Sequence, residues 1–253
     1  MPGEDKQLAQ MLEAESYTLS RINPSPEDGL YLHLSDLRQA LDRVATSEEI
    51  RMLDYGCGGC PYRGLFPNAL YHRADFTEVA GLDFKIGEDS LLGGVEDAYY
   101  DRVLSTQVLE HVQNPQRYLG EAHRILRRGG DFVVTTHGCF HDHGCPHDYY
   151  RWTADGLRLA LEREGFLIES LCKLTTNARA VISLGEHYLG GIFGSRLSKP
   201  GFAWWIFREL FWKNRVGRNR WVDERMAANR VVDAQVPGHE IYIGLMAVAR
   251  KGA

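Results

Sequence analysis

The residues best suited to hold a nucleotide-like ligand lie between positions 50 and 60, where the sequence reads IRMLDYGCGGC. Apolar residues lead into Asp54, and glycines follow at Gly56, Gly58 and Gly59. This order is typical of a buried strand that ends on a carboxylate and passes through a glycine-rich loop into a helix. Glycines let the backbone approach a ligand closely, and a helix start offers free N–H donors. The stretch therefore predicts a site for a nucleotide-like ligand.

The glycine-rich loop does not match the dinucleotide fingerprint G-x-G-x-x-G, because Pro61 occupies the position of the third glycine. It resembles instead the first motif of class I S-adenosylmethionine (SAM) methyltransferases, D-x-G-x-G-x-G, with Cys60 in place of the last glycine. The ligands differ in a relevant way, since a dinucleotide needs N–H groups aimed at a pyrophosphate and SAM has no phosphate. The resemblance implies that SAM is the cofactor and that four loop residues contact it: Asp54, Gly56, Cys57 and Gly58.

An acidic residue, Asp75, ends a second predicted strand over residues 70–76. It follows the glycines by about 20 residues, the interval at which a carboxylate at a strand end can bind ribose hydroxyls. A solvated turn aspartate is the alternative, and the glycine-rich loop upstream favours ribose binding. The resemblance also places a second carboxylate, Asp83, against the adenine amino group, and it adds the neighbouring rings of Phe76 and Phe84 to the cofactor site.

Two further motifs extend the resemblance over residues 50–170. After a predicted strand at 102–105, the run TQVLEHV at 106–112 resembles the VLEHV signature of type-11-like methyltransferases, and it brings Thr106 and Gln107 to the cofactor. The run RILRRGG at 124–130 matches the RxLxxGG turn of the same family. The sequence is therefore identified as similar to the type-11-like subgroup of class I SAM-dependent methyltransferases.

Periodicity predicts the elements that must position these residues. Apolar residues at helical spacing predict helices over about 30–44, 115–127 and 153–164, with Gly129-Gly130 closing the second. Further strands are expected at 132–136, 166–174 and 241–249. The family resemblance implies an α/β fold, a Rossmann-like doubly wound sheet of seven strands in the order 3-2-1-4-5-7-6. Strand 7 is antiparallel, and helices cover both faces. We expect an N-terminal helical segment at 1–45 and the methyltransferase domain at 46–253.

The loop at 137–152 carries four histidines, two cysteines and two aspartates, which by residue type could form a zinc site. Its spacing argues against one, because no CxxC pair occurs within it, and the nearest such pair, Cys57 with Cys60, belongs to the glycine-rich loop. The loop resembles a family segment with the order H-x-x-P-x-D-Y-Y-R-W-T, which forms a lid and the acceptor side of the pocket without metal. We therefore expect no metal in this loop.

Three histidines are candidates for a catalytic base. Methyl transfer is an in-line displacement, and a hydroxyl acceptor must also lose its proton, for which histidine is well suited near neutral pH. The candidates are His111, just after the fourth strand, and the lid residues His143 and His147. For His111 the alternative is a hydrogen bond that holds the following loop.

The sequence thus favours a SAM-dependent methyltransferase that modifies a small-molecule or sugar acceptor at oxygen, as in bacterial glycan or natural-product modification. The alternatives are a nitrogen or carbon acceptor in a natural product, a SAM-binding protein without turnover, and a zinc-binding interaction module. Acceptor residues lie on loops that the fold does not dictate, so the sequence does not identify the acceptor.

Composition narrows the partners and the compartment. The chain has 253 residues and a formal net charge of -5, which gives no reason to expect nucleic-acid binding. No apolar run approaches the roughly 20 residues that span a bilayer. Five cysteines without a small-scaffold spacing favour a reducing compartment, so we expect a cytoplasmic protein. The sequence indicates no oligomeric state.

A long insertion at 175–239 separates the last two predicted strands. Its segment 202–221 combines tryptophans with arginines and lysines, the composition of helices that lie in a membrane interface. Packing on the sheet as a lid, or a dimer contact, is the interpretation that we favour. The alternative is peripheral contact with the inner membrane face, where a lipid-linked glycan would be accessible.

Overall fold

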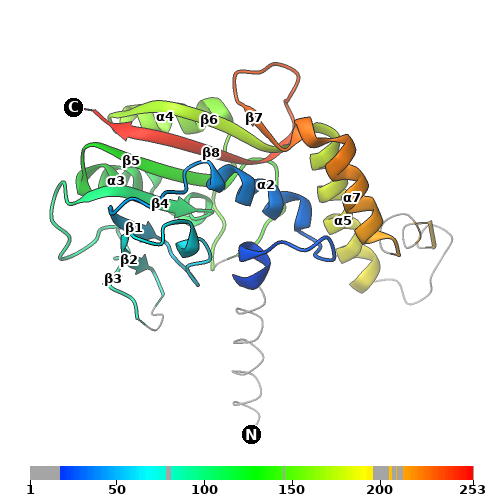
Figure 1. The fold of residues 1–253 in the computed structure, drawn as a ribbon, viewed down its shortest axis with the longest axis horizontal. Coiled ribbons are helices and arrows are strands. Elements are labelled where there is room, and N and C mark those ends of the chain that lie inside the picture. Colours follow the sequence, from blue (N-terminus) through cyan, green and yellow to red (C-terminus); the bar gives the residue numbers. More distant parts are fainter. Residues whose placement is uncertain are drawn as a thin grey trace, which may run out of the picture.

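The computed structural model describes residues 18–77, 81–144, 146–195, 205–206, 209 and 213–252. An eight-stranded sheet forms its centre (Figure 1). The strands are β1 (Arg51–Tyr55), β2 (Leu70–Asp75), β3 (Phe84–Lys85), β4 (Tyr100–Thr106), β5 (Leu126–His137), β6 (Phe166–Thr176), β7 (Val231–Asp233) and β8 (Tyr242–Lys251). The helices around it are α2 (Tyr31–Asp42), α3 (Pro115–Ile125), α4 (Ala154–Arg163), α5 (Asn177–Ser195) and α7 (Arg215–Arg225).

The strand order is β3-β2-β1-β4-β5-β8-β6-β7. The first five strands are parallel, and β8 runs antiparallel between β5 and β6. The predicted α/β class and the order 3-2-1-4-5-7-6 are therefore confirmed, with β8 as the predicted seventh strand. The sheet has one strand more than predicted, because the insertion supplies the short edge strand β7, which pairs with β6. Three residues are too few to show a strand pattern in the sequence.

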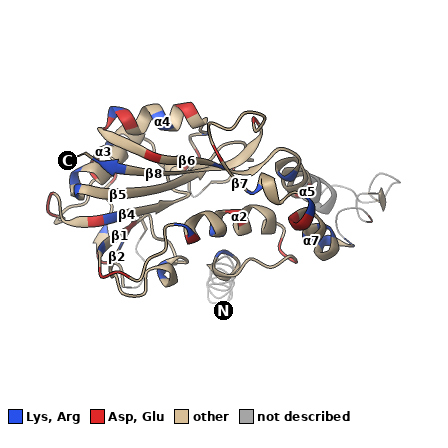
Figure 2. Ribbon diagram, turned by 45° about the horizontal axis from the view of Figure 1, so that its top comes forward, with Lys and Arg blue, Asp and Glu red and all other residues tan. Residues whose placement is uncertain are grey.

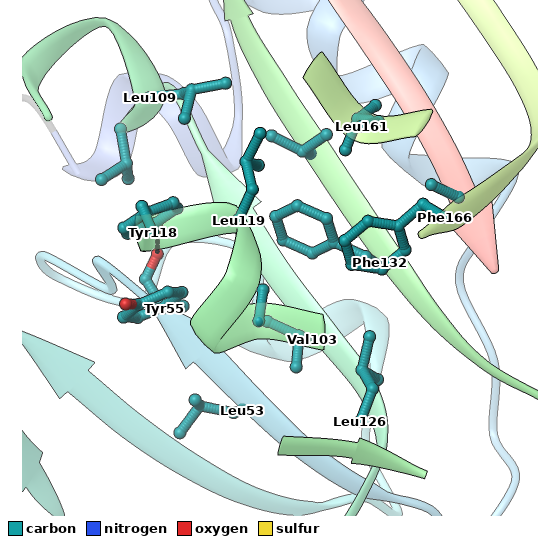
Figure 3. Close-up of a cluster of buried hydrophobic side chains, with 14 of the residues drawn as sticks. Leu53, Tyr55, Val103, Leu109, Tyr118, Leu119, Leu126, Phe132, Leu161 and Phe166 are labelled. Atoms are coloured by element: carbon teal, nitrogen blue, oxygen red, sulfur yellow. Dashed lines mark hydrogen bonds between the residues drawn. The ribbon is translucent and has the colours of Figure 1, made fainter. Parts of the chain in front are cut away.

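Successive side chains of a strand point to opposite faces of the sheet. Both faces carry apolar side chains, and helices cover both. On β1, Met52 packs with α2 residues such as Leu37 and Leu41. Its neighbours Leu53 and Tyr55 pack on the opposite face, in a cluster that α3 and α4 complete (Figure 3). Figure 3 shows the rings of this second cluster side by side, and the aromatic pair Tyr55–Tyr118 is stacked with ring centroids 4.0 Å apart.

Two local predictions were wrong. A helix was expected after the glycine-rich loop, but the chain forms only a 3₁₀ helix at Arg63–Leu65 before it enters β2. The second predicted helix, α3, ends at Ile125, so Gly129-Gly130 lies inside β5 and does not close the helix. A Cβ at Gly130 would lie 2.9 Å from the carbonyl oxygen of Asp101, and this close approach of two strands accounts for that glycine.

The insertion packs on α2 through buried charges. Figure 2 shows acidic and basic residues on both α2 and α7, which contact each other. Asp36 of α2 is fully buried, and both of its oxygens accept hydrogen bonds from Arg179 of α5, at 2.7 and 2.8 Å. Arg230 adds a bond to Asp36 at 2.8 Å, and Arg179 also reaches Asp223 of α7 at 2.8 Å. Burial raises the pKa of Asp36 to about 6, although both arginines favour the charged form.

The predicted membrane-contact segment at 202–221 is described only in part: positions 202–204, 207–208 and 210–212 lie outside the described residues. Within the part of the chain that the structure describes, no helix is long and apolar enough to cross a membrane.

Replacing Arg179 should lower the free energy of unfolding far more than replacing an exposed arginine that also pairs with an aspartate of α2. Arg179→Met leaves the buried Asp36 with one cation fewer, and breaking a buried pair typically costs about 3–5 kcal/mol. The matched control is Arg38→Met, whose partner Asp42 lies one turn away on the exposed side of α2, where a pair contributes less than about 1 kcal/mol. Urea unfolding at neutral pH measures both. Equal losses in the two variants would contradict the role given to the Asp36–Arg179 pair.

Candidate functional site

The backbone N–H groups of the glycine-rich loop are used within the protein. Gly56 and Cys57 donate to the carbonyl oxygen of Ala74, at 2.8 and 3.0 Å. Gly58 donates to the carboxylate of Asp75 at 2.8 Å. These bonds tie the loop to the end of β2. Since three successive N–H donors have partners, the loop fits a ligand without phosphate better than it fits a dinucleotide.

Gly56 is required where the ends of β1 and β4 meet. Its φ is +83°, and a Cβ there would lie 2.5 Å from a methyl group of Val108. The hydroxyl of Tyr118 on α3 donates to the carbonyl of Tyr55 at 2.8 Å and so fixes the start of the loop. A Cβ at Gly58 would meet no atom within 4 Å, which leaves open space above this part of the loop.

Two carboxylates lie beneath and beside the loop. Asp54 is buried, and one of its oxygens accepts from the hydroxyl of Tyr71 at 2.5 Å. The other oxygen, Oδ1, has no hydrogen-bond partner among the described residues. Burial raises the pKa of Asp54 to about 7, although the Tyr71 bond opposes the shift. Asp75 also accepts two bonds from Thr77, so it orders the turn after β2 as well as the loop.

The structure separates Asp83 from the other predicted cofactor residues. Its carboxylate accepts the backbone N–H of Arg73 at 2.8 Å and pairs with that guanidinium at 3.7 Å. Arg73 lies two residues before the end of β2, so Asp83 lies along the sheet and not at its carboxyl edge. Phe84 is opposite Ala74 and packs against the core. Phe76, which directly follows β2, is 39% exposed and remains accessible to a ligand.

The end of β4 brings Thr106 and Gln107 to the same edge as the glycine-rich loop. Gln107 has a φ of +54°, and its N–H donates to the carbonyl of Thr135 at 2.9 Å. Its side-chain amide lies 2.8 Å from Nε2 of His33 on α2. The other ring nitrogen of His33 lies 3.4 Å from the hydroxyl of Thr175. An N–H of the amide donates to Nε2, since amide nitrogens do not accept.

Residues just before α2 lie against the glycine-rich loop. A Cβ at Gly59 would lie 2.4 Å from the hydroxyl of Thr18. Arg21 donates to the hydroxyl of Tyr62 at 3.5 Å. Burial lowers the pKa of His33 to about 3, and the charge of Arg21 adds to this shift. The N-terminal residues therefore form one wall of the site.

A cluster of four side chains lies beyond β4 and β5, next to the loop. We call it the Glu–His cluster; its members are Glu110, His111, His137 and His143. His137 Nε2 lies 3.3 Å from Glu110 Oε1. The ring of His143 lies 4.8 Å from that of His111 and 5.0 Å from that of His137. Burial raises the pKa of Glu110 to about 7 and lowers the pKa values of His137 and His143.

Two members of this cluster were not singled out from the sequence. Glu110 adjoins His111 in the VLEHV motif, and His137 ends β5 much as Asp75 ends β2. A search for polar residues at every predicted strand end would have found His137. Nothing in the sequence shows that Glu110 turns inward, where its side chain is fully buried.

The predicted lid is pinned to the same residues. Within the lid, the backbone N–H groups of Tyr149 and Tyr150 donate to the carbonyl of Glu110, at 2.8 and 3.2 Å. The N–H of Trp152 donates to the carbonyl of His137 at 2.9 Å. The described part of the lid is thus bonded to the backbones of both residues that the sequence did not single out.

Of the three predicted bases, the structure brings His111 and His143 together and leaves His147 apart. Nδ1 of His143 lies 3.3 Å from the Asp148 carboxylate, which Arg151 holds through two hydrogen bonds. Nδ1 of His111 lies 2.6 Å from the carbonyl oxygen of His147. The side chain of His147 is exposed, so only its backbone reaches the cluster.

Comparison with known proteins decides the family. A family model described as "Methyltransferase domain" matches residues 31–171, more than half of the chain. The chain belongs to the methyltransferase domain family. It is a SAM-dependent methyltransferase of class I, as the motifs predicted. A search of curated proteins gave no match.

Solved structures of low sequence identity share the fold. A possible histamine N-methyltransferase of Thermotoga maritima is 16% identical over 95% of this chain and 96% of that chain, with a TM-score of 0.56. The [4+2]-cyclase SpnF is 18% identical over 98% and 96%, with a TM-score of 0.53. Phosphoethanolamine N-methyltransferase 2 of Haemonchus contortus, in complex with SAM, is 17% identical over 87% of this chain and 52% of that chain, with a TM-score of 0.50.

The residues at the carboxyl edge of the sheet fit SAM. The open space above Gly58 admits a ligand, and the unpartnered Oδ1 of Asp54 is a buried acceptor below the loop. The carboxylate of Asp75 lies at the end of the neighbouring strand. Together they offer acceptors for hydroxyl and ammonium groups and no free row of donors for a phosphate.

The buried His33 should make stability depend on pH. In the folded protein His33 stays neutral down to about pH 3, whereas in the unfolded chain it takes up a proton below about 6.5. Stability from His33 is therefore lost as the pH falls below 6.5, by about 1.4 kcal/mol per pH unit.

We expect the free energy of unfolding of the wild type, relative to His33→Gln, to fall by about 2 kcal/mol between pH 7 and pH 5. Urea unfolding of both proteins at several pH values measures this difference. Contributions to stability that the wild type and the variant share cancel in it. A difference that stays constant with pH would contradict a neutral, buried His33.

Proposed function

We propose that this methyltransferase transfers the methyl group to a hydroxyl oxygen of a small-molecule or sugar acceptor. The observation that supports it best is the Glu–His cluster, which places imidazole groups beside the predicted SAM site. When bound, SAM supplies an electrophilic methyl group on a sulfonium. The chain has to hold the acceptor in line, exclude water and take up the proton of the hydroxyl.

We assign the cofactor contacts to the carboxyl edge of the sheet. Asp75 receives the ribose hydroxyls, and Phe76 lies against the adenine. Gly56, Cys57 and Gly58 pass under the amino-acid end, and Asp54 accepts from its ammonium group. Thr106 and Gln107 complete the edge at β4. Asp83 and Phe84 were also expected at the cofactor, but the bond of Asp83 to Arg73 gives them no support.

His111 is the base that the geometry supports best. A carbonyl oxygen only accepts, so the nitrogen 2.6 Å from the His147 carbonyl must carry the hydrogen. Nε2 of His111 therefore keeps its lone pair and can take a proton. His143 has the same arrangement, because its Nδ1 faces the Asp148 carboxylate and the carbonyl of His141. His147 lacks such an arrangement.

A nitrogen acceptor is the second candidate. Two of the solved structures named above are an N-methyltransferase and a possible one, and a neutral amine needs no base before it attacks. A third carries the name of a cyclase, so the fold alone does not fix the reaction. We keep a small molecule or sugar with a hydroxyl group as the favoured acceptor and the cytoplasm as the location. Among the described residues, the cysteines Cys57, Cys60, Cys139 and Cys172 are free, which is consistent with a reducing compartment.

Replacing the ribose carboxylate should weaken SAM binding. A hydrogen bond to a charged group contributes about 1.5–3 kcal/mol, and 1.4 kcal/mol is a factor of ten in affinity. We expect Asp75→Asn to bind SAM and its demethylated product about 10- to 100-fold more weakly by calorimetry. Asp97→Asn is the control, since this exposed aspartate pairs with Arg124 away from the loop. An affinity in Asp75→Asn equal to the control would remove the ribose role, and a larger loss in Asp83→Asn would reassign it.

Turnover should separate His111 from His147. A general base contributes typically about 10²–10⁴-fold, so His111→Ala should lower transfer of labelled methyl by that factor at saturating SAM. His147→Ala should lower it less than tenfold, because only the backbone carbonyl of His147 touches the cluster. The acceptor in this assay is the fraction of a cell extract to which the wild-type protein transfers labelled methyl. Equal effects of the two substitutions would contradict the assignment of the base.

A further inference from the structure

Three potential metal ligands converge from three separate elements. Glu110 lies in the 3₁₀ helix Leu109–His111 after β4, His137 ends β5, and His143 lies in the lid. One ligand atom of each lies within 4.8 Å of those of the other two. Glu110 and His137 are buried, and His143 is partly exposed. The group therefore has two buried ligands and one, His143, that reaches the surface.

Two polar atoms in this group have no hydrogen-bond partner. Oε1 of Glu110 and Nδ1 of His137 are buried, and neither makes a hydrogen bond within the described part of the chain. Oε2 of Glu110 accepts from Thr136 at 2.8 Å, so the carboxylate is held in place with Oε1 directed at His137. Leaving buried polar atoms unpaired costs free energy, typically about 1–3 kcal/mol each. A cation bound at Oε1 would remove this cost for Glu110.

The distances suit one small cation. Zn²⁺ binds histidine nitrogen and carboxylate oxygen at about 2.0–2.2 Å in a tetrahedron, which sets two ligand atoms roughly 3.3–3.6 Å apart. His137 Nε2 and Glu110 Oε1 are 3.3 Å apart. The ligand atom of the third residue, His143, lies within 4.8 Å of the other two, so it has to move inward by at most about 1.5 Å to reach this range. It lies in a loop next to Gly144, where such a movement needs no change in the sheet.

Neighbouring groups orient the lid ligand. Nδ1 of His143 faces the carboxylate of Asp148, at 3.3 Å, and the carbonyl of His141, at 3.2 Å. This arrangement puts the hydrogen on Nδ1 and leaves the lone pair on Nε2. Arg151 fixes Asp148 at 2.5 and 2.6 Å. Metal-binding histidines almost always donate their second N–H to a carboxylate, a carbonyl or water in this way.

We propose that Glu110, His137 and His143 bind one divalent transition-metal cation of the Zn²⁺ type. Two histidines and one glutamate leave the fourth tetrahedral position open, as catalytic zinc sites do. The absence of a CxxC pair in the lid, which predicted no metal there, does not bear on this group. One ligand precedes the lid by a whole helix and strand, and the other two are six residues apart.

The role of the cation rests on the proposed oxygen methylation, whereas its binding does not. The acceptor hydroxyl oxygen would take the open position, where a cation lowers its pKa. Its proton passes to Nε2 of His111, whose ring lies 4.8 Å from that of His143. The new O–C bond forms as the C–S bond to the methyl group breaks, and the electron pair of that bond stays on sulfur. The substrate class is therefore a hydroxyl compound that can approach a cation.

Zinc binding by the purified full-length chain tests the site without any acceptor. The protein is stripped with a chelator and titrated with Zn²⁺ against a chromophoric indicator, and Co²⁺ provides a spectrum of tetrahedral coordination. We expect about one Zn²⁺ per chain. Glu110→Gln and His143→Ala should each weaken binding at least 100-fold, and Asp148→Asn should weaken it about 10- to 100-fold. The tetrahedral Co²⁺ bands should disappear in His143→Ala.

Two controls locate the metal. His123→Ala changes a histidine of α3 that packs against Phe166 outside the cluster, and it should leave zinc affinity unchanged. The double substitution Cys57→Ser/Cys60→Ser removes the CxxC pair, and it should also leave zinc affinity unchanged. Thermal unfolding of each variant identifies any that do not fold, and the partly exposed His143→Ala is the variant expected to fold normally.

Several results would overturn the site. These are a wild type that binds no zinc at micromolar concentration, equal zinc affinity in wild type and His143→Ala, and loss of zinc in the cysteine variant. SAM binding is measured by calorimetry in the same samples. If the chain binds SAM normally but binds no zinc, the metal site alone is overturned. If the folded chain does not bind SAM, the proposed function is overturned, whatever the zinc result.

Discussion

The buried carboxylate of Asp36 connects the elements outside the sheet with the residues at its functional edge. Arg179 and Arg230 hold it from the insertion, and the hydroxyl of Thr175 at the end of β6 donates to it at 2.9 Å. Thr175 contacts His33, which accepts from Gln107 beside the glycine-rich loop. A fully buried carboxylate requires such partners, because an unpaired charge there is very unfavourable. The position of α2, and with it one wall of the site, therefore depends on this ion pair.

Much of the fold could be predicted because it depends on patterns that extend over many residues. The apolar run before Asp54 and the helical spacing of Leu34, Leu37 and Leu41 each indicate one element, and the family resemblance supplied the strand order. The missing helix after the glycine-rich loop could not be predicted in this way, since Gly56 and Cys57 bond to Ala74 across the sheet and not to a following turn. The edge strand β7 forms only because β6 offers it a partner.

The candidate site was predictable where it lies in a single motif and not where it is assembled from several. Asp54, Asp75 and the glycines follow from spacing along the chain. Glu110 and His137 could not be paired from the sequence, because their meeting depends on adjacent parallel strands that end at the same edge. For Asp83, which the resemblance placed at the adenine, the structure shows a bond to the backbone N–H of Arg73, two residues before the end of β2. The insertion contributes buried charges to α2, which its aromatic and basic composition did not indicate.

The most direct test of this account is a crystal structure of the full chain with S-adenosylhomocysteine, the demethylated form of SAM. The account predicts that the ribose hydroxyls bond to Asp75, that the homocysteine end lies over Gly58, and that the sulfur faces the Glu–His cluster. The position vacated by the methyl group should then point toward His111. A ligand bound elsewhere, or one bound with its sulfur directed away from Glu110, His111, His137 and His143, would contradict the claim that this edge of the sheet performs methyl transfer.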